Sequence, residues 1–113
     1  MNMTHNEFVP PPIRDSLLWY AVDFDSTIAT GTWSIDNPHS IPGAPMNIHK
    51  LQEVIDAGFK VAIHTSRGWA DYELVECWLL HHSIPFDKIV CGKLLAHRYV
   101  DDRAINAEAN SWL

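Results

Sequence analysis

The sequence predicts an α/β fold, a single three-layer domain in which a mostly parallel sheet carries helices on both faces. Apolar runs of strand length alternate along the chain with segments whose apolar residues recur at helical spacing, as in parallel sheets with right-handed crossovers. Each apolar run also ends in a polar cluster, and the carboxyl ends of parallel strands meet at one edge of a sheet. At 113 residues, we expect one core and no second domain.

The individual elements follow from local patterns. Strands are expected at short apolar runs, and helices where residues such as Leu51, Val54 and Ile55 recur three and four apart. Gly58 and Pro85 follow the two longer helices as stop signals. In chain order we expect an extended lead-in at 1–15, a strand at 17–23, a long irregular or hairpin-like segment at 26–44, a helix at 45–57, a strand at 59–64, a helix at 71–82, strands at 88–91 and 98–100, and a helix at 104–109.

The composition excludes several classes of protein. Hydrophobic residues make up 47% of the chain, which indicates a folded core, yet no apolar stretch is long enough to span a bilayer. The N-terminus lacks the pattern of a signal peptide, so we expect a cytoplasmic protein with no membrane partner. Two cysteines, Cys77 and Cys91, show no metal spacing and suit a reducing compartment. The formal net charge of −6 disfavours avid nonspecific binding to nucleic acid.

Two carboxylates spaced one residue apart, Asp23 and Asp25, end the first predicted strand. If the strand breaks after Asp23, the two side chains can diverge and take different tasks, one attacking and one moving a proton. The stretch from Asp23 to Thr27 is also good turn and cap chemistry, because Asp, Ser and Thr bond nearby backbone amides. Polar clusters after the later strands favour the functional interpretation.

Those later clusters are Thr65-Ser66-Arg67, Lys93 and Asp101-Asp102. With the first pair they supply a nucleophile, a proton shuttle, donors for phosphoryl oxygens, a cation and carboxylates for a hard metal ion, which is the set that phosphoryl transfer needs. In this order the four clusters resemble the four motifs of the haloacid dehalogenase (HAD) superfamily, over residues 17–105. The stretch 99–104 is similar to the last motif of its small phosphatases. The resemblance implies a Rossmann-like sheet.

The resemblance also implies a role for each site residue. Asp23 would attack phosphorus to form an aspartyl-phosphate, and Asp25 would protonate the leaving oxygen and then activate water. Thr65, or Ser66 in its place, would donate to a phosphoryl oxygen, and Lys93 would neutralise charge on the phosphoryl group. The second acid, Asp25, favours the phosphatases over the dehalogenases of the superfamily. We therefore expect a phosphomonoester hydrolase.

Mg²⁺ is the cofactor that the resemblance implies. Asp101 would hold the ion together with the Asp23 carboxylate and the backbone carbonyl of Asp25. Asp102 would be either a second ligand or an outer-shell anchor. Arg67 has two interpretations, which are binding of substrate phosphate and structural pairing with Asp101 or Asp102.

Several other polar and aromatic side chains have structural alternatives. Thr65 and Ser66 would equally well cap the helix that follows them. His64 lies inside a predicted strand, where a packed core residue is more common than a metal ligand. Trp33 and Trp69 lie in loops beside the motif clusters and either stack on a substrate ring or pack the loop.

The chain has no room for the cap domain of larger HAD members, because the segments between its motifs hold at most a loop, one helix and a strand. An open site suits a large substrate such as a polynucleotide end or a phosphoprotein, whereas a homo-oligomer would be needed to exclude water around a small sugar phosphate or nucleotide. Two other functions compete with hydrolysis. One is a metal-binding interaction module without turnover. The other, a receiver-like phosphoacceptor domain, is disfavoured by the motif order.

Overall fold

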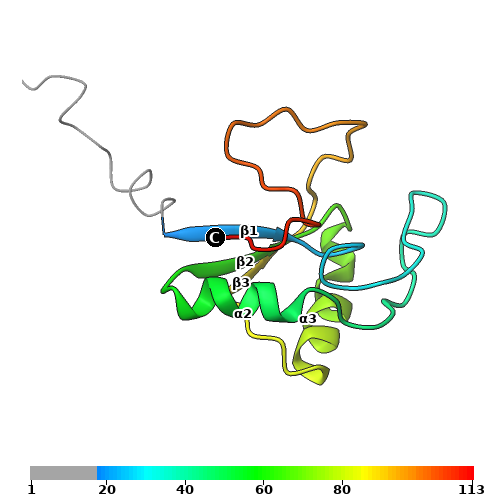
Figure 1. Ribbon diagram of the computed structural model, residues 1–113. Helices are drawn as coiled ribbons and strands as arrows, with labels where there is room; N and C mark the ends of the chain where they lie inside the picture. The colour runs from blue at the N-terminus through cyan, green and yellow to red at the C-terminus, as the bar shows by residue number, and fades with distance from the viewer. Residues whose placement is uncertain (1–17) are drawn as a thin grey trace, which may run out of the picture.

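The computed structural model describes residues 18–113 as a small α/β domain with one three-stranded sheet and two α-helices (Figure 1). The strands are parallel and follow the order β1-β2-β3. The expected lead-in at residues 1–15 lies outside the described residues. The elements are β1 (Trp19–Asp23), α2 (Ile48–Asp56), β2 (Lys60–His64), the 3₁₀ turn η1 (Trp69–Asp71), α3 (Tyr72–His81) and β3 (Lys88–Val90). The α/β class and the parallel sheet are thus confirmed for the described residues.

Successive side chains of β1 and β2 point to opposite sides of the sheet, which gives it one apolar face and one face that no helix covers, here called the open face. Val22 of β1 pairs in register with Ile63 of β2, and both side chains are buried. Asp23 and His64 are the next pair in register, and their side chains turn to the opposite face. Helices α2 and α3 cover the apolar face, and their buried apolar residues are Leu51, Val54, Val75, Trp78 and Leu79.

The expectation of helices on both faces is wrong for the described residues. Both crossovers step across the sheet in the same direction, from β1 to β2 and from β2 to β3. Right-handed crossovers that step in one direction place their helices on the same face. Figure 1 accordingly shows α2 and α3 together below the sheet. No helix of residues 18–113 is long and apolar enough to span a bilayer.

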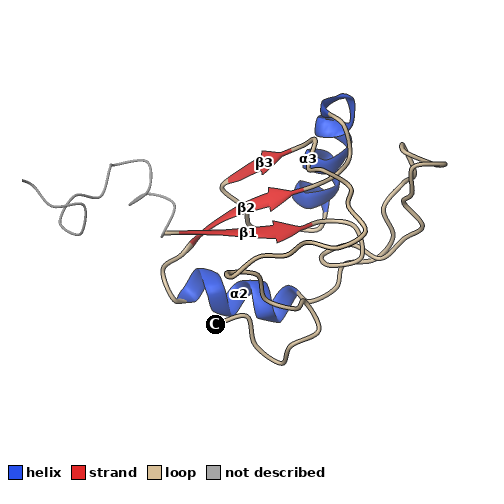
Figure 2. Cartoon of the chain, turned by 90° about the horizontal axis from the view of Figure 1, so that it is seen from above, coloured by secondary structure: helices blue, strands red, loops and turns tan. Residues whose placement is uncertain are grey.

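The open face is spanned by residues 93–107, here called the arch. After β3 the chain rises over the sheet and returns along β1 towards α2 (Figures 1 and 2). The return is fixed by two bonds, in which the Tyr20 hydroxyl donates to the Trp112 carbonyl at 2.9 Å and the Lys50 ammonium donates to the Ala107 carbonyl at 3.1 Å. The Trp112 side chain is buried against the core. The arch therefore covers a face that neither helix reaches.

The predicted strand at 98–100 and the predicted helix at 104–109 are wrong, because the chain forms neither element there. Hydrogen bonds between side chains and the nearby main chain form here in place of the main-chain hydrogen bonds of a strand or helix. The Tyr99 hydroxyl donates to the Leu94 carbonyl at 2.5 Å, and Asp101 Oδ1 accepts the Arg103 N–H at 2.7 Å. Val100, which the apolar pattern places in a buried strand, is fully exposed.

The segment between β1 and α2 is hairpin-like, as the sequence predicts. The Thr30 N–H donates to the Ala44 carbonyl at 2.8 Å, and the Gly43 N–H donates back to the Thr30 carbonyl at 2.6 Å. A Cβ atom at Gly43 would lie 2.5 Å from the Thr30 hydroxyl oxygen, so this close approach requires glycine. The Trp78 indole N–H donates to the Gly43 carbonyl at 3.1 Å and ties the segment to α3.

Candidate active site

Asp23 occupies the carboxyl end of β1 and faces the space beneath the arch. Its side chain is 40% exposed. Oδ1 lies 3.8 Å from the Lys93 ammonium, and Oδ2 accepts a hydrogen bond from the Thr27 hydroxyl at 3.3 Å. Burial raises the pKa of the Asp23 carboxyl, and the nearby Lys93 charge opposes that rise. Asp23 is therefore a partly desolvated carboxylate with a cation on one side and a hydroxyl donor on the other.

A tight turn after β1 separates Asp23 from Asp25. The buried Phe24 carbonyl accepts the N–H groups of Ile28 and Ala29 at 2.9 and 3.0 Å, and Ser26 adopts a left-handed conformation with φ of 66°. The strand ends at this point, so the two carboxylates diverge. Asp23 turns to the open face of the sheet, whereas Asp25 turns to a buried arginine.

That arginine is Arg67, which forms a bidentate pair with Asp25. Arg67 Nε donates to Asp25 Oδ2 and Arg67 Nη2 donates to Asp25 Oδ1, both at 2.9 Å. Arg67 Nη1 also donates to Asp71 Oδ2 at 3.2 Å, and Asp71 Oδ1 lies 2.6 Å from His39 Nδ1. We call these four residues the Arg67 network. The prediction that Arg67 pairs with Asp101 or Asp102 is wrong. Arg67 does pair with carboxylates, but they are those of Asp25 and Asp71.

Thr65 and Ser66 begin the loop that follows β2. Thr65 is fully buried, and its hydroxyl oxygen accepts the Arg67 N–H at 3.1 Å. Its carbonyl accepts the Lys93 N–H at 2.9 Å, which holds the start of the arch beside β2. Ser66 is half-buried. Neither residue caps the next helix, because η1 begins after Gly68 and has no side-chain cap.

Lys93 lies between Asp23 and the ring of Tyr99. Its ammonium is 4.3 Å from the ring centre, a cation–π contact that adds to the ion pair. His64 lines the same space, and burial lowers its pKa, with Lys93 adding to the fall. His64 is thus a half-buried residue of the open face rather than the packed core residue that its strand position predicts.

The two acids after the last predicted strand have different surroundings. Asp101 is exposed on the arch but lines the same cavity as Asp23, whereas Asp102 does not line it. Within residues 18–113, no three acidic, histidine or cysteine side chains gather closely enough to form a metal cage. Mg²⁺ commonly takes only one or two carboxylates and completes its shell with water and substrate phosphate. The oxygen donors of Asp23 and Asp101 suit that chemistry.

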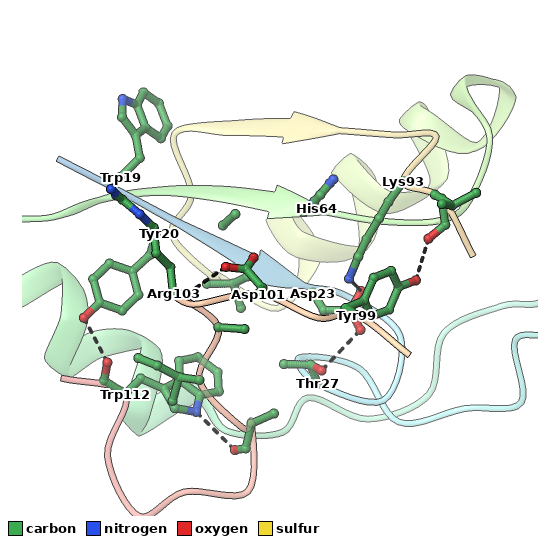
Figure 3. Close-up of a pocket in the computed structure, with 16 residues that line it drawn as sticks. Trp19, Tyr20, Asp23, Thr27, His64, Lys93, Tyr99, Asp101, Arg103 and Trp112 are labelled. Atoms are coloured by element: carbon green, nitrogen blue, oxygen red, sulfur yellow. Dashed lines mark hydrogen bonds and ion pairs between the residues drawn. The ribbon is translucent and has the colours of Figure 1, made fainter. Parts of the chain in front are cut away.

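A cavity of about 1200 Å³ lies beside Asp23 and is lined also by Thr27, His64, Lys93, Tyr99 and Asp101 (Figure 3). Asp25, Thr65, Ser66 and Arg67 do not line it. Its floor is the open face of β1, and residues of the arch form its roof. Trp33 and Trp69 do not line it. The Trp33 indole N–H donates to the Pro38 carbonyl at 3.0 Å and packs that loop, whereas the exposed Trp69 ring stacks on Tyr72 of α3.

Sequence reasoning assigned no role to four side chains of this region, namely Thr27, His39, Asp71 and Tyr99. Asp71 had a signal, since it lies four residues after Arg67, the spacing at which side chains of one helical turn meet. Thr27 adjoins the Asp23 motif and is placed by the Asn47 side chain, which donates to its carbonyl at 2.8 Å. His39 carries no signal, because only the tertiary fold brings it to Asp71. Tyr99 contacts Lys93 and Leu94, its near neighbours in sequence, through a loop conformation that the sequence pattern does not reveal.

No family model and no curated protein matches this chain. Among solved structures, the chain is similar to the crystal structure of an MCSG target from Vibrio cholerae, with a TM-score of 0.62 and 27% sequence identity. The likeness covers 81% of this chain and 89% of that one. It supports the α/β architecture.

Proposed function

We propose that the protein is a phosphomonoester hydrolase of the HAD type in which Asp23 is the nucleophile. The observation that supports this most strongly is the placement of Asp23 at a strand end, between the Lys93 ammonium and the Thr27 hydroxyl and at one end of a large cavity. A nucleophile on a rigid strand with a cation beside it fits attack on an anionic phosphoryl group.

In the first proposed step, an Asp23 oxygen attacks phosphorus. A bond forms between Asp23 and phosphorus while the bond from phosphorus to the ester oxygen breaks, and the leaving oxygen takes a proton from the protonated Asp25 carboxyl group to become an alcohol. In the second step, water attacks phosphorus, gives its proton to a base and releases phosphate and the Asp23 carboxylate. Lys93, 3.8 Å from Asp23 Oδ1, offsets the negative charge of the phosphoryl group in both steps.

Asp25 is the proposed proton shuttle, and Arg67 fixes its direction. Each Asp25 oxygen accepts one N–H from Arg67, which leaves lone pairs free to take a proton from water. The Arg67 guanidinium is fully buried. We therefore assign Arg67 a positioning role in place of direct binding of substrate.

Ser66 is the better candidate for the hydroxyl that donates to a phosphoryl oxygen. Thr65 is fully buried and its hydroxyl oxygen accepts the Arg67 N–H, whereas Ser66 is half-buried and therefore accessible. In this assignment Thr65 shapes the loop and Ser66 contacts substrate.

Mg²⁺ belongs to the proposal as a cation held by oxygen ligands. The Asp23 carboxylate, the Asp25 main-chain carbonyl and Asp101 would hold it, and Asp102, outside the cavity lining, would be an outer-shell anchor. The ion would supply further stabilisation of negative charge on the phosphoryl group.

Turnover of 4-nitrophenyl phosphate with Mg²⁺ tests the proposal. We expect Asp23→Asn to lower kcat by at least about a thousandfold, because the nucleophile is lost. Asp36→Asn is the matched control, since Asp36 is an exposed carboxylate outside the cavity lining. Full activity in Asp23→Asn would reject Asp23 as the nucleophile. Metal binding without hydrolysis across a panel of phosphomonoesters would favour the interaction module instead.

A further inference from the structure

The cavity beside Asp23 extends well beyond the space that a phosphoryl group needs. It runs from Asp23 along β1 to Trp19, beneath the arch (Figure 3). These two residues are four positions apart on the strand, a span of about 13 Å. A phosphoryl group at Asp23 fills one end of this space, so the organic group of the ester has the rest.

Most residues that line the cavity are apolar, and four of them are aromatic. Tyr99 stands next to Lys93 at the Asp23 end, and Trp19 lies at the other end of β1. Tyr20 and Trp112 line the cavity from the opposite side of the strand. Aromatic walls bind flat apolar groups through stacking and dispersion.

Tyr99 is fixed by hydrogen bonds before any ligand binds, and Trp19 makes a cation–π contact. The Tyr99 hydroxyl donates to the Leu94 carbonyl at 2.5 Å and accepts the Ala96 N–H at 3.2 Å. The Lys88 ammonium lies 4.5 Å from the centre of the Trp19 ring. A wall that is already ordered loses little side-chain entropy on binding, which favours affinity.

The floor between the two ends is Ala21. Residues at positions i, i+2 and i+4 of a strand share one face, so Ala21 lies between Trp19 and Asp23 on the open side. Its side chain is small and exposed, and it lines the cavity. The space above Ala21 is therefore free for a flat group.

We propose that the substrate is a small phosphomonoester whose organic group carries a planar aromatic ring, as in aryl alkyl and nucleoside monophosphates, and that the ring lies between Ala21 and the arch. This inference rests on the proposed function. A polynucleotide fits less well, because among the described lining residues only Lys93 and Arg103 are cationic and the chain has a net charge of −6.

The test compares 2-(1-naphthyl)ethyl phosphate with ethyl phosphate, two esters of primary alcohols that differ in the ring. We expect the KM of the naphthyl ester to be lower by about tenfold or more. Ala21→Leu should fill the floor and reduce this preference by about tenfold, whereas Ala57→Leu, at the exposed end of α2, should leave it unchanged. Adenosine monophosphate in the same assay distinguishes a nucleoside from a simple aryl ring.

The outcomes separate this inference from the proposed function. Equal KM values for the two esters, an equal effect of Ala21→Leu on both, or a stronger preference for a 5′-phosphorylated oligonucleotide would overturn the ring site while hydrolysis stands. Absence of turnover with every ester would overturn the proposed function. In that case, calorimetry with 2-(1-naphthyl)ethylphosphonate and ethylphosphonate still tests the ring site, and equal affinities would reject it.

Discussion

Replacement of the buried Arg67 should destabilise the fold strongly. Its buried guanidinium makes three hydrogen bonds to the carboxylates of Asp25 and Asp71, whose side chains are only 15% and 6% exposed. Arg67→Met keeps an unbranched apolar stem but leaves two carboxylates without their cation. Removal of one partner of a buried ion pair lowers stability by about 3–5 kcal/mol. We expect the upper part of this range, a large share of the roughly 5–15 kcal/mol that stabilises a typical domain.

Urea unfolding followed by tryptophan fluorescence measures this loss, with the slope m checked for constancy. Arg98→Met is the matched control, because Arg98 is exposed and its side chain donates to the adjacent His97 carbonyl; its effect should stay within about 0.5 kcal/mol. Arg67→Lys should be intermediate, since one ammonium cannot reproduce the two-pronged contact with Asp25. A loss below about 1 kcal/mol for Arg67→Met would refute the reasoning, because buried carboxylates would then tolerate the absence of their cation.

Three further predictions concern single side chains. Burial raises the folded-state pKa of Asp23 above its usual 3.8, so the charged form of Asp23 destabilises the native state. Asp23→Asn should therefore raise Tm at pH 7, and the Tm difference between the variant and the wild type should shrink as the pH falls below 3.8. A lower Tm for Asp23→Asn at pH 7 would contradict this. Iodoacetamide should label Cys77 in the native protein and spare Cys91, which is buried and whose pKa burial raises; equal labelling would count against the structure. His39→Ala should lower the free energy of unfolding by at most about 1 kcal/mol in urea, because His39 is 71% exposed where it meets Asp71; a loss as large as that of Arg67→Met would be inconsistent with an exposed contact.

The regular elements could be predicted from the sequence because their signals are local. The apolar run before Asp23, the helical spacing of Leu51 and Val54, and the apolar run before Thr65 each correspond to an element of the structure within a few residues. Helix α2 begins at Ile48 rather than Pro45, because Asn47 adopts a left-handed conformation with φ of 58° that a helix does not continue through.

The arch and the Arg67 network could not be predicted, because both depend on contacts distant in sequence. The arch carries apolar residues that favour a strand, but Tyr99 and Asp101 bond locally and the return path depends on Lys50 and Tyr20, more than fifty residues away. Likewise, Arg67 pairs with Asp25 across 42 positions. The sequence placed Asp23 and Lys93 at one edge of the sheet, but it did not predict the partners of Arg67 or the path of residues 98–109.

The central claim is that Asp23 forms a covalent bond to phosphorus. The direct measurement is acid quenching of the intact protein during turnover of 4-nitrophenyl phosphate with Mg²⁺, reduction with borohydride and mass spectrometry of its peptides. The proposed mechanism predicts that Asp23 is converted to homoserine, because borohydride reduces an acyl phosphate, and that Asp23→Asn abolishes the product. Turnover with unmodified Asp23, or with the modification on Asp25, would contradict the proposal.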